Sequence, residues 1–273
     1  MKLKETILIT GNNGFIGSYI RDDLKERYTC VGISRSENID ITSYLDMQKL
    51  DIEPDIIIHA AAVLSNDVEE AFQVNVIGTL NICKYAKEKN VRHLILISSL
   101  SIYERAENEY FNVYGRTKKQ SEEIANAYCI ENNIKLTILR LSQVYDDKGL
   151  AKQSQGMLYY FIDTIKNSQK ISIFGNKNPL RNYIHIDYLT QVIHDVVKKG
   201  KGGTYNVRED KSHTITEIAY IIFDLLKITP NIIVLRDKLD IGSVFIPEEN
   251  RYISNIEPIS LRNGIQRILN YEK

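Results

Sequence analysis

Short apolar runs alternate with longer amphipathic segments over the first 145 or so residues of the chain. Five β-rich runs, at 6–10, 30–34, 55–60, 93–98 and 135–141, have the continuous apolar character of strands that are buried on both faces of a parallel sheet. Between them, the segments 71–90 and 113–132 repeat apolar residues at helical spacing, and Asn112 is placed to cap the second one. This alternation predicts an α/β fold with a doubly wound parallel sheet and right-handed crossovers.

The pattern loosens after Tyr145. A polar loop leads to a predicted helix at 157–166, and mixed segments, short helices and a strand come after it. We therefore expect residues 1–145 to form the sheet domain. Residues 146–273 should form mainly a smaller, discontinuous cap on the carboxyl edge of the sheet, with segments near 171–207 returning to it.

Composition excludes several classes of partner. The 273 residues carry 35 Lys and Arg against 35 Asp and Glu, so there is no overall charge to attract nucleic acid or an anionic membrane. We therefore expect no nucleic-acid partner. We also expect no membrane partner, because no run reaches the ~18 consecutive apolar residues of a membrane span. The cysteines and histidines show no metal-ligand spacing, so no metal site is expected. The short apolar run near the N-terminus does not match a signal peptide, and the expected location is the cytoplasm.

A glycine-rich turn comes directly after the first predicted strand. Its sequence, TGNNGFIG, places Gly11, Gly14 and Gly17 between a strand and a predicted helix of a βαβ unit. In that context Gly11 permits the tight turn, Gly14 lets the backbone approach a pyrophosphate, and Gly17 lets helix and strand pack closely. The helix N-terminus would then bind the anion. The first 145 residues are thus predicted to be a Rossmann-like, NAD(P)-binding domain.

The end of the second predicted strand bears on the choice of cofactor. An acidic residue there binds the ribose 2′-hydroxyl of NAD, whereas an arginine suits the 2′-phosphate of NADP. The chain has Ser34 and Arg35 there, with no carboxylate before Glu37, so NADP is favoured and NAD is the alternative. Slightly later, Asp40 and Ile41 offer a carboxylate and a backbone N–H to the adenine.

Eight segments in order resemble the extended short-chain dehydrogenase/reductase family, in particular its sugar-nucleotide epimerases, dehydratases and 4-ketoreductases. They are TGNNGFIG (10–17), DITS (40–43), IIIHAAA (56–62), NVIGTLNI (75–82), ISSLSIYE (97–104), YGRTK (114–118), LRLSQVY (139–145) and RNYIHIDYL (181–189). The resemblance implies small side chains lining the cofactor groove and an Asn75 that positions the active-site backbone, although a helix-capping role explains Asn75 almost as well. Together with the turn chemistry, it gives a cofactor site of Gly11, Asn13, Gly14, Phe15, Ile16, Gly17, Ser34, Arg35, Asp40, Ile41, Ala60, Ala61, Ala62, Tyr114, Lys118 and Leu141.

The resemblance also implies a catalytic trio of Ser99, Tyr114 and Lys118. Tyr114 would exchange a proton with a sugar oxygen, and the ammonium of Lys118, one helical turn away, would stabilise its phenolate. Ser99 would donate a hydrogen bond to the same oxygen. The pattern Tyr-x-x-x-Lys also occurs at Tyr85 and Lys89, but that pair lies on a predicted helix far from a strand end, and we interpret it as structural.

The two residues after Ser99 narrow the choice of reaction. Dehydratases of the family carry an Asp–Glu pair there, and this chain has Leu100 and Ser101. A 4-ketoreductase that consumes NADPH, acting on a nucleotide-linked 4-keto-6-deoxyhexose, is favoured by Arg35, by the short cap and by the 15 positions from Ser99 to Tyr114. A 4-epimerase with retained NAD is the alternative. A non-catalytic dinucleotide-binding sensor or scaffold is the alternative from another class.

Substrate contacts are assigned by the same resemblance. A nucleotide-diphosphate sugar would be held by Ser99, Ser101, Gln143, Arg181 and Arg251, with the arginines on the phosphates. His185 is interpreted as structural. The helices at 71–90 and 113–132 resemble those that form a homodimer in this family. The nucleotide, the sugar and the stereochemistry at C4 are left open.

Overall fold

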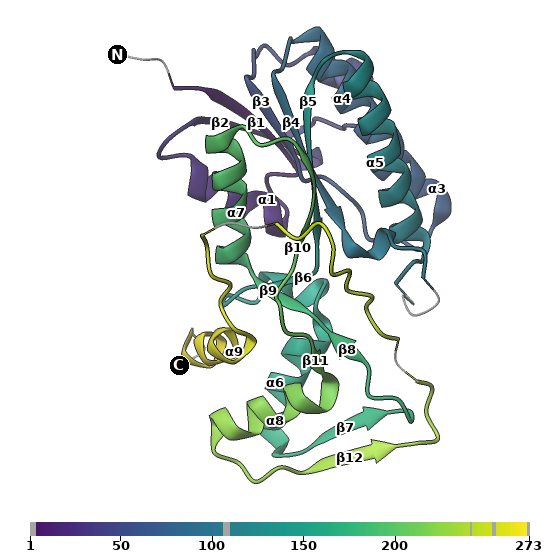
Figure 1. The fold of residues 1–273 in the computed structure, drawn as a ribbon, viewed down its shortest axis with the longest axis vertical. Coiled ribbons are helices and arrows are strands. Elements are labelled where there is room, and N and C mark those ends of the chain that lie inside the picture. Colours follow the sequence, from purple (N-terminus) through teal and green to yellow (C-terminus); the bar gives the residue numbers. More distant parts are fainter. Residues whose placement is uncertain (1–3, 106–109, 241, 253–254, 272–273) are drawn as a thin grey trace.

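The computed structural model describes residues 4–105, 110–240, 242–252 and 255–271 of the chain. Its centre is a six-stranded parallel sheet in the order β10-β5-β4-β3-β1-β2 (Figure 1). The strands are β1 (Thr6–Thr10), β2 (Thr29–Ile33), β3 (Ile56–His59), β4 (His93–Ser99), β5 (Lys135–Leu141) and β10 (Gly203–Val207). The predicted α/β fold with a doubly wound sheet is confirmed.

Side chains of the central strands are buried on both faces of the sheet, which explains why these strands are apolar throughout. Along β1, Ile7 and Ile9 join one core cluster, whereas Leu8 between them joins another. The first cluster includes residues of α1 (Phe15–Leu24) and α7 (Ile186–Lys199), and the second includes residues of α4 (Gly78–Glu88) and α5 (Val113–Glu131). The helices therefore cover opposite faces, as Figure 1 shows.

The two predicted helices differ in how regular they are. The second is α5, and the Asn112 side chain accepts a hydrogen bond from the Gly115 N–H at its N-terminus. The first is interrupted: α3 (Val68–Ala71) passes into a π-helical turn, η2 (Phe72–Ile77), and only then into α4. Asn75 lies inside this π-helical turn, so it does not cap a helix.

The smaller half is built from paired short strands and helices below the sheet in Figure 1. β7 (Ile171–Phe174) pairs with β12 (Ile232–Leu235), β8 (Leu180–Arg181) with β11 (His213–Thr214), and β6 (Gln143–Tyr145) with β9 (Tyr183–His185). Its core includes side chains from α6 (Gly156–Ser168), α8 (Ile215–Leu226) and α9 (Leu261–Tyr271). The remaining short elements are η1 (Arg35–Glu37), α2 (Tyr44–Gln48), η3 (Leu100–Ile102) and η4 (Leu150–Gln153).

Residues 242–252, which we call the strap, run from the cap back to the sheet. The Val244 N–H donates to the Leu180 carbonyl in the cap (3.4 Å), and the Asn206 N–H on β10 donates to the Asn250 carbonyl (2.7 Å). The strap therefore lies across the boundary of the two halves. Among the helices of the described ranges, none is long and apolar enough to span a membrane.

Candidate functional site

The glycine turn between β1 and α1 is closed by contacts that leave no room for side chains. A Cβ atom on Gly17 would lie 2.1 Å from the Gly11 carbonyl oxygen, and one on Gly11 would lie 2.8 Å from the Ala61 Cα. Gly11 also has a φ of 68°, which favours glycine. No side chain caps the N-terminus of α1 at Gly14. The first N–H groups of α1 are therefore available to an anion, as a pyrophosphate requires.

The end of β2 holds a small polar network next to this turn. Asn13 donates to the hydroxyls of Ser34 (2.9 Å) and Ser36 (2.8 Å). The Glu37 carboxylate accepts from the Ser34 hydroxyl (3.0 Å) and from the Asn12 amide (3.3 Å). The sequence places Glu37 after the strand, but the turn of η1 directs its carboxylate back to Ser34. Glu37 is thus a candidate for contact with the adenosine ribose that the sequence reasoning passed over.

The other predicted cofactor residues follow β3 (Ala60, Ala61 and Ala62), follow η1 (Asp40 and Ile41) or end β5 (Leu141). The Ala61 N–H donates to the Thr10 hydroxyl (3.2 Å), Ala60 is half-buried and Ala62 is exposed. Asp40 accepts from the Thr42 N–H (2.9 Å), while Ile41 is buried and its carbonyl accepts from Asn81. Leu141, at the end of β5, is also buried. Of these positions, Ala60 and Ala61 lie against the glycine turn, where a Cβ on Gly11 would meet their backbone.

The predicted catalytic trio comes from two neighbouring elements. Ser99 ends β4, whereas Tyr114 and Lys118 lie one turn apart on α5. Burial raises the pKa of Tyr114 to about 12, and a hydrogen bond with Ser99 lowers that pKa. Ser99 in turn donates to the Ser101 hydroxyl (2.9 Å). The hydroxyls of Ser99 and Tyr114 therefore lie together, as a shared substrate oxygen requires.

Lys118 is enclosed by protein, with 2% of its surface exposed. Its Nζ donates to the Ile97 carbonyl on β4 (2.7 Å), which fixes the ammonium beside the strand. Burial lowers the pKa of Lys118 to about 8, because a charged group is poorly solvated there, and Glu122 raises that pKa. Lys118 is thus fixed beside β4, one helical turn after Tyr114 on α5.

The sequence patterns do not single out two charged residues near Lys118, Glu122 and Arg140. The Arg140 guanidinium on β5 donates to both oxygens of Glu122 on α5, at 2.7–3.1 Å, and the carboxylate also accepts from the Ser98 hydroxyl (2.5 Å). Glu122 is 5% exposed. Lys118 and Glu122 are spaced i and i+4 on the helix, which could have drawn attention to Glu122. No pattern in the sequence around Glu122 indicates that its carboxylate pairs with Arg140.

Asn75 and Tyr85 are polar residues on the same segment of chain with different contacts. The Asn75 amide donates to Thr117 on α5 (3.0 Å) and to the Val63 carbonyl (3.1 Å), so it ties η2 to α5 and to the loop after β3. Tyr85 is buried, and its hydroxyl donates to the Ile52 carbonyl (3.3 Å). Tyr85 is therefore part of the core.

Two of the predicted substrate residues are found at a pocket of about 270 Å³. Gln143 and Arg181 line it, and the Arg181 guanidinium lies 5.5 Å from the ring of Tyr110, which also lines it. Ser101 lies beside Ser99. The other lining residues are Ser154, Gln155, Gly156, Met157 and Tyr183. Tyr110 was not among the predicted substrate residues, although it lines the pocket beside Arg181. Residues 106–109 of the predicted sugar-covering loop lie outside the described residues.

Arg181 and Arg251 do not share one site. Arg181 is buried and donates to the carbonyls of Leu180 (2.8 Å) and Gly242 (2.6 Å). Arg251, on the strap, instead forms an ion pair with Asp210. The arrangement of two arginines forked on one diphosphate is therefore not preformed.

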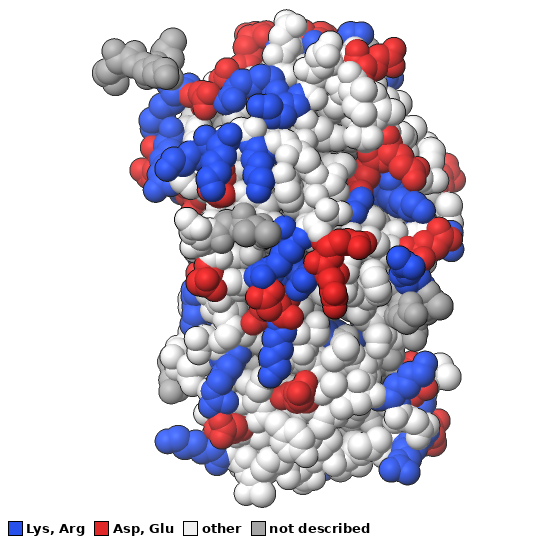
Figure 2. Space-filling view, viewed as in Figure 1, with Lys and Arg blue, Asp and Glu red and all other residues white. Residues whose placement is uncertain are grey.

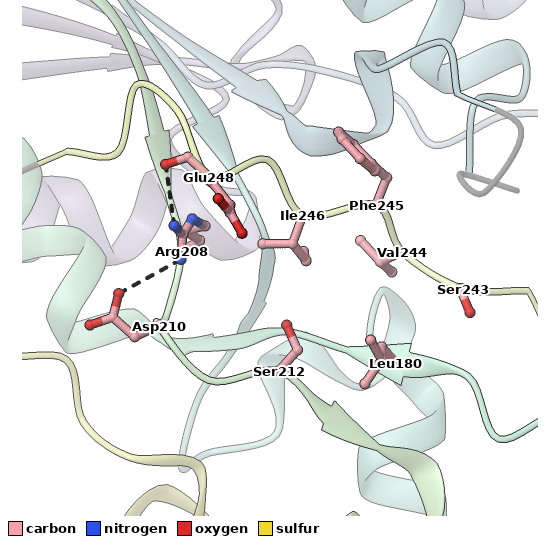
Figure 3. A pocket seen from close by; sticks show the side chains of 9 residues that line it. All are labelled: Leu180, Arg208, Asp210, Ser212, Ser243, Val244, Phe245, Ile246 and Glu248. Atoms are coloured by element: carbon pink, nitrogen blue, oxygen red, sulfur yellow. Dashed lines mark hydrogen bonds and ion pairs between the residues drawn. The ribbon is translucent and has the colours of Figure 1, made fainter.

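A larger pocket of about 770 Å³ lies between the strap and the loop that follows β10 (Figure 3). Arg208 enters it, flanked by Asp210 and by the backbone of Glu248, and Phe245 closes the far side. The remaining lining residues are Leu180, Ser212, Ser243, Val244 and Ile246.

Figure 2 shows positive and negative side chains interspersed over this face of the molecule, so an anion would be recognised locally rather than by a broad field.

One group of potential metal ligands exists among the described residues. Asp147, His185 and Asp187 bring ligand atoms within 4.8 Å of one another. The Arg267 guanidinium donates to both carboxylates, at 2.6 and 2.7 Å, and already supplies a positive charge that balances them. The two ring nitrogens of His185 contact Asp147 and the Asp187 N–H. This geometry fits an ion-pair network that joins α9 to the cap.

The sheet, the glycine turn and the Tyr–Lys helix define a nicotinamide-dinucleotide enzyme of the extended short-chain dehydrogenase/reductase type. The chain belongs to the NAD-dependent epimerase/dehydratase family, whose sequence model matches residues 7–207.

Relatives with several activities resemble the whole chain or most of it. A putative UDP-glucose 4-epimerase from Methanocaldococcus jannaschii is 26% identical, with 98% of each chain covered. Human dTDP-D-glucose 4,6-dehydratase is 25% identical, over 82% of this chain and 74% of the relative.

Solved structures show the same fold. The UDP-glucose 4-epimerase of Thermotoga maritima, solved with UDP-glucose, has a TM-score of 0.81 at 20% identity, with 98% of each chain covered. The dTDP-4-dehydrorhamnose reductase of Bacillus anthracis, solved with NADP, has a TM-score of 0.79 at 22% identity, with 99% of each covered. An epimerase and a reductase thus match equally well, and the fold does not separate the two reactions.

Proposed function

We propose that this protein is an NADPH-dependent reductase that acts at C4 of a nucleotide-linked 4-keto-6-deoxyhexose. The observation that carries the proposal is the hydrogen-bonded pair of Ser99 and Tyr114 beside the buried Lys118. The residues after Ser99, Leu100 and Ser101, supply no acid–base pair for the elimination of water. The same trio argues against a non-catalytic sensor, because a protein that only binds a dinucleotide has no need of it.

Each side chain has a defined task in this reaction. The bound cofactor supplies a hydride to C4. Tyr114 then gives its proton to the C4 oxygen, and its raised pKa keeps it protonated at neutral pH, as an acid must be. Ser99 donates a hydrogen bond to the same oxygen. The ammonium of Lys118 stabilises the phenolate that Tyr114 leaves behind.

The preference for NADPH rests on Arg35. It begins η1 at the end of β2 and its side chain is exposed, where it can bind a 2′-phosphate. The Glu37 carboxylate beside Ser34 favours NAD instead, because it can accept from a free ribose hydroxyl. Comparing NADPH with NADH for the wild type and for Arg35→Ala decides between these residues. An unchanged preference in the variant would remove the case for NADPH.

A nucleotide-sugar 4-epimerase with retained NAD is the second candidate. It is supported by Glu37 and by the similarity to a putative UDP-glucose 4-epimerase along the full chain. The substrate under either proposal is a nucleotide-diphosphate sugar, whose phosphates Arg181 would bind from the smaller pocket. Arg251 would join it only after leaving Asp210.

The test is a panel of UDP-, dTDP-, GDP- and CDP-linked 4-ketosugars, with oxidation of NADPH followed by absorbance. Net oxidation with a 4-ketosugar supports the reductase, whereas interconversion of C4 epimers without net oxidation supports the epimerase. Tyr114→Phe should lower turnover by about 10²–10⁴-fold. Tyr85→Phe, at the other Tyr-x-x-x-Lys pattern, should change it less than about threefold. Full activity of Tyr114→Phe would overturn the mechanism.

We further propose that the protein forms a homodimer through the helices at 71–90 and 113–132. Apolar side chains exposed in and beside these segments, Val68, Phe72 and Ile130, support this proposal. Sedimentation at micromolar concentration should give about twice the 31.4 kDa of the chain, and a monomer would contradict it.

A further inference from the structure

A buried ion pair lies one helical turn beyond Lys118 on α5: the Glu122 carboxylate accepts from Ser98, and the neighbouring Ile97 carbonyl on β4 accepts from the Lys118 ammonium. Arg140 donates to both oxygens of Glu122, and the Glu122 carboxylate and the Arg140 guanidinium come from α5 and β5. Their side chains are 7% and 19% exposed. Removing two charges from water is costly, so a pair in this position is weak evidence for stability alone. Its position beside the reaction centre calls for another explanation.

The groups around Lys118 make Glu122 its negative neighbour. Glu122 raises the pKa of Lys118, against the larger effect of burial. On β3, His59 is buried, and burial followed by the charge of Lys118 lowers its pKa to about 3, so it is neutral near pH 7. On β4, the Ile97 carbonyl accepts from Nζ (2.7 Å). Arg140 approaches from β5 but is bound to Glu122. Among the described residues that shift this pKa, Glu122 alone favours the charged amine.

We propose that Glu122 is a positioning residue for the reaction, and that from one helical turn away it holds Lys118 as the charged amine beside β4, while Arg140 and Ser98 hold the Glu122 carboxylate in place. This proposal rests on the proposed function, because it assigns Glu122 a role through the catalytic lysine. The effect of Glu122 is exerted through the charge of Lys118.

The pair is also anchored beyond α5 and β5. Arg140 donates from Nη1 to the Tyr103 hydroxyl (3.0 Å), and Tyr103 donates to the Asn206 side chain on β10 (3.0 Å). The Asn206 amide donates to the Glu249 carbonyl on the strap (2.7 Å). Three strands and the strap therefore determine where the Glu122 carboxylate lies. A group that only filled space would not require this support.

The decisive variant is Glu122→Gln, which removes the charge and keeps the size. The matched control is Glu123→Gln, the next residue of α5, which loses the same charge from an exposed side chain. In ¹³C-lysine-labelled protein, with the Lys118 signal assigned by its absence from Lys118→Met, the titration of Lys118 should shift to lower pH by about one unit in Glu122→Gln. It should not shift in Glu123→Gln.

Turnover provides a second measurement. The alkaline limb of the pH profile of kcat should move to lower pH in Glu122→Gln, with KM for the sugar changed less than about twofold.

If Glu122→Gln does not fold, the double variant Glu122→Gln/Arg140→Met, which removes both charges, replaces it and should show a smaller shift in the same direction. An unshifted Lys118 titration in a folded variant overturns this proposal. A shifted titration without turnover of any nucleotide sugar overturns the proposed function and leaves the role of Glu122 in Lys118 charge intact.

Discussion

The sheet half and the cap place their functional side chains by different means. In the sheet half, each group lies at the end of a strand or in the first turns of the following helix, as Gly11, Ser99 and Tyr114 show. In the cap, the small pocket is assembled from segments separated by tens of residues, with Gln143 on β6, Met157 on α6 and Arg181 on β8. The proposed cofactor residues are therefore set by local sequence, whereas the proposed substrate residues depend on how distant segments pair.

The two halves also use ion pairs differently. Arg140 and Glu122 are buried between α5 and β5, whereas Arg267 reaches Asp147 and Asp187 with 40% of its side chain exposed. Water can solvate the second network when a partner is lost, but not the first. The contrast predicts that equal substitutions have unequal costs.

Arg140→Met is expected to have the largest effect. It strands the Glu122 carboxylate in the protein interior and should lower the free energy of unfolding by about 3–5 kcal/mol. Arg267→Met should cost about 1 kcal/mol or less, because its partners remain hydrated. Urea unfolding at pH 7 measures both. Equal losses would show that burial does not distinguish the two networks.

Gly17→Ala in the sheet half and Gly264→Ala in the cap compare the effects of one added methyl group at two tightly packed glycines. A Cβ on Gly17 would meet the Gly11 carbonyl oxygen at 2.1 Å, which should displace the glycine turn and weaken cofactor binding by about 100-fold or more. In the cap, a Cβ on Gly264 would lie 1.7 Å from the hydroxyl of the buried Tyr145. Gly264→Ala should therefore destabilise the protein by about 1–3 kcal/mol but leave cofactor affinity within about twofold. Calorimetric titration with NADPH and NADH separates the two outcomes, and a comparable loss of affinity in both variants would refute the distinction.

Sensitivity to acid should originate mainly in the sheet half. Burial and the charge of Lys118 lower the pKa of His59 to about 3, whereas an unfolded histidine titrates near 6.5. Between these values the unfolded chain binds more protons, so the stability present above about pH 6.5 is lost as the pH falls. The loss should approach about 3 kcal/mol by pH 4. His59→Gln should flatten this slope in urea titrations, and His213→Gln in the cap should flatten it less. Identical slopes for wild type and His59→Gln would contradict the assignment.

Much of the fold was predictable because it depends on local patterns. The five apolar runs predicted strands within one or two residues of β1 to β5, and Asn112 caps α5. The glycine turn was predictable because its three glycines, each with its own backbone requirement, fall within seven residues of sequence. The roles of Ser99, Tyr114 and Lys118 stay predictions until the variants are measured.

The contacts that the sequence could not provide depend on pairing between distant segments. Arg140 and Glu122 are 18 positions apart and meet only because α5 packs on β5. Arg251 was assigned to phosphate, but Asp210 is its partner because the strap passes beside β10. Glu37 was set aside because the turn of η1, which directs its carboxylate to Ser34, is not apparent in an apolar pattern. Charge, spacing and periodicity do not encode these contacts locally.

The π-helical turn η2 has a consequence for how this chain could tolerate insertions and deletions. Such a turn holds one residue more than regular helix, and the Gly78 N–H donates to the Gln73 carbonyl five positions earlier. Deleting one residue within 72–77 would let an ordinary helix run through. Everything on its N-terminal side would rotate by about 100° relative to α4. A deletion after Asn75 would swing its amide away from Val63 and Thr117. Loss of a single codon there would thus disable the enzyme while improving the regularity of its helix.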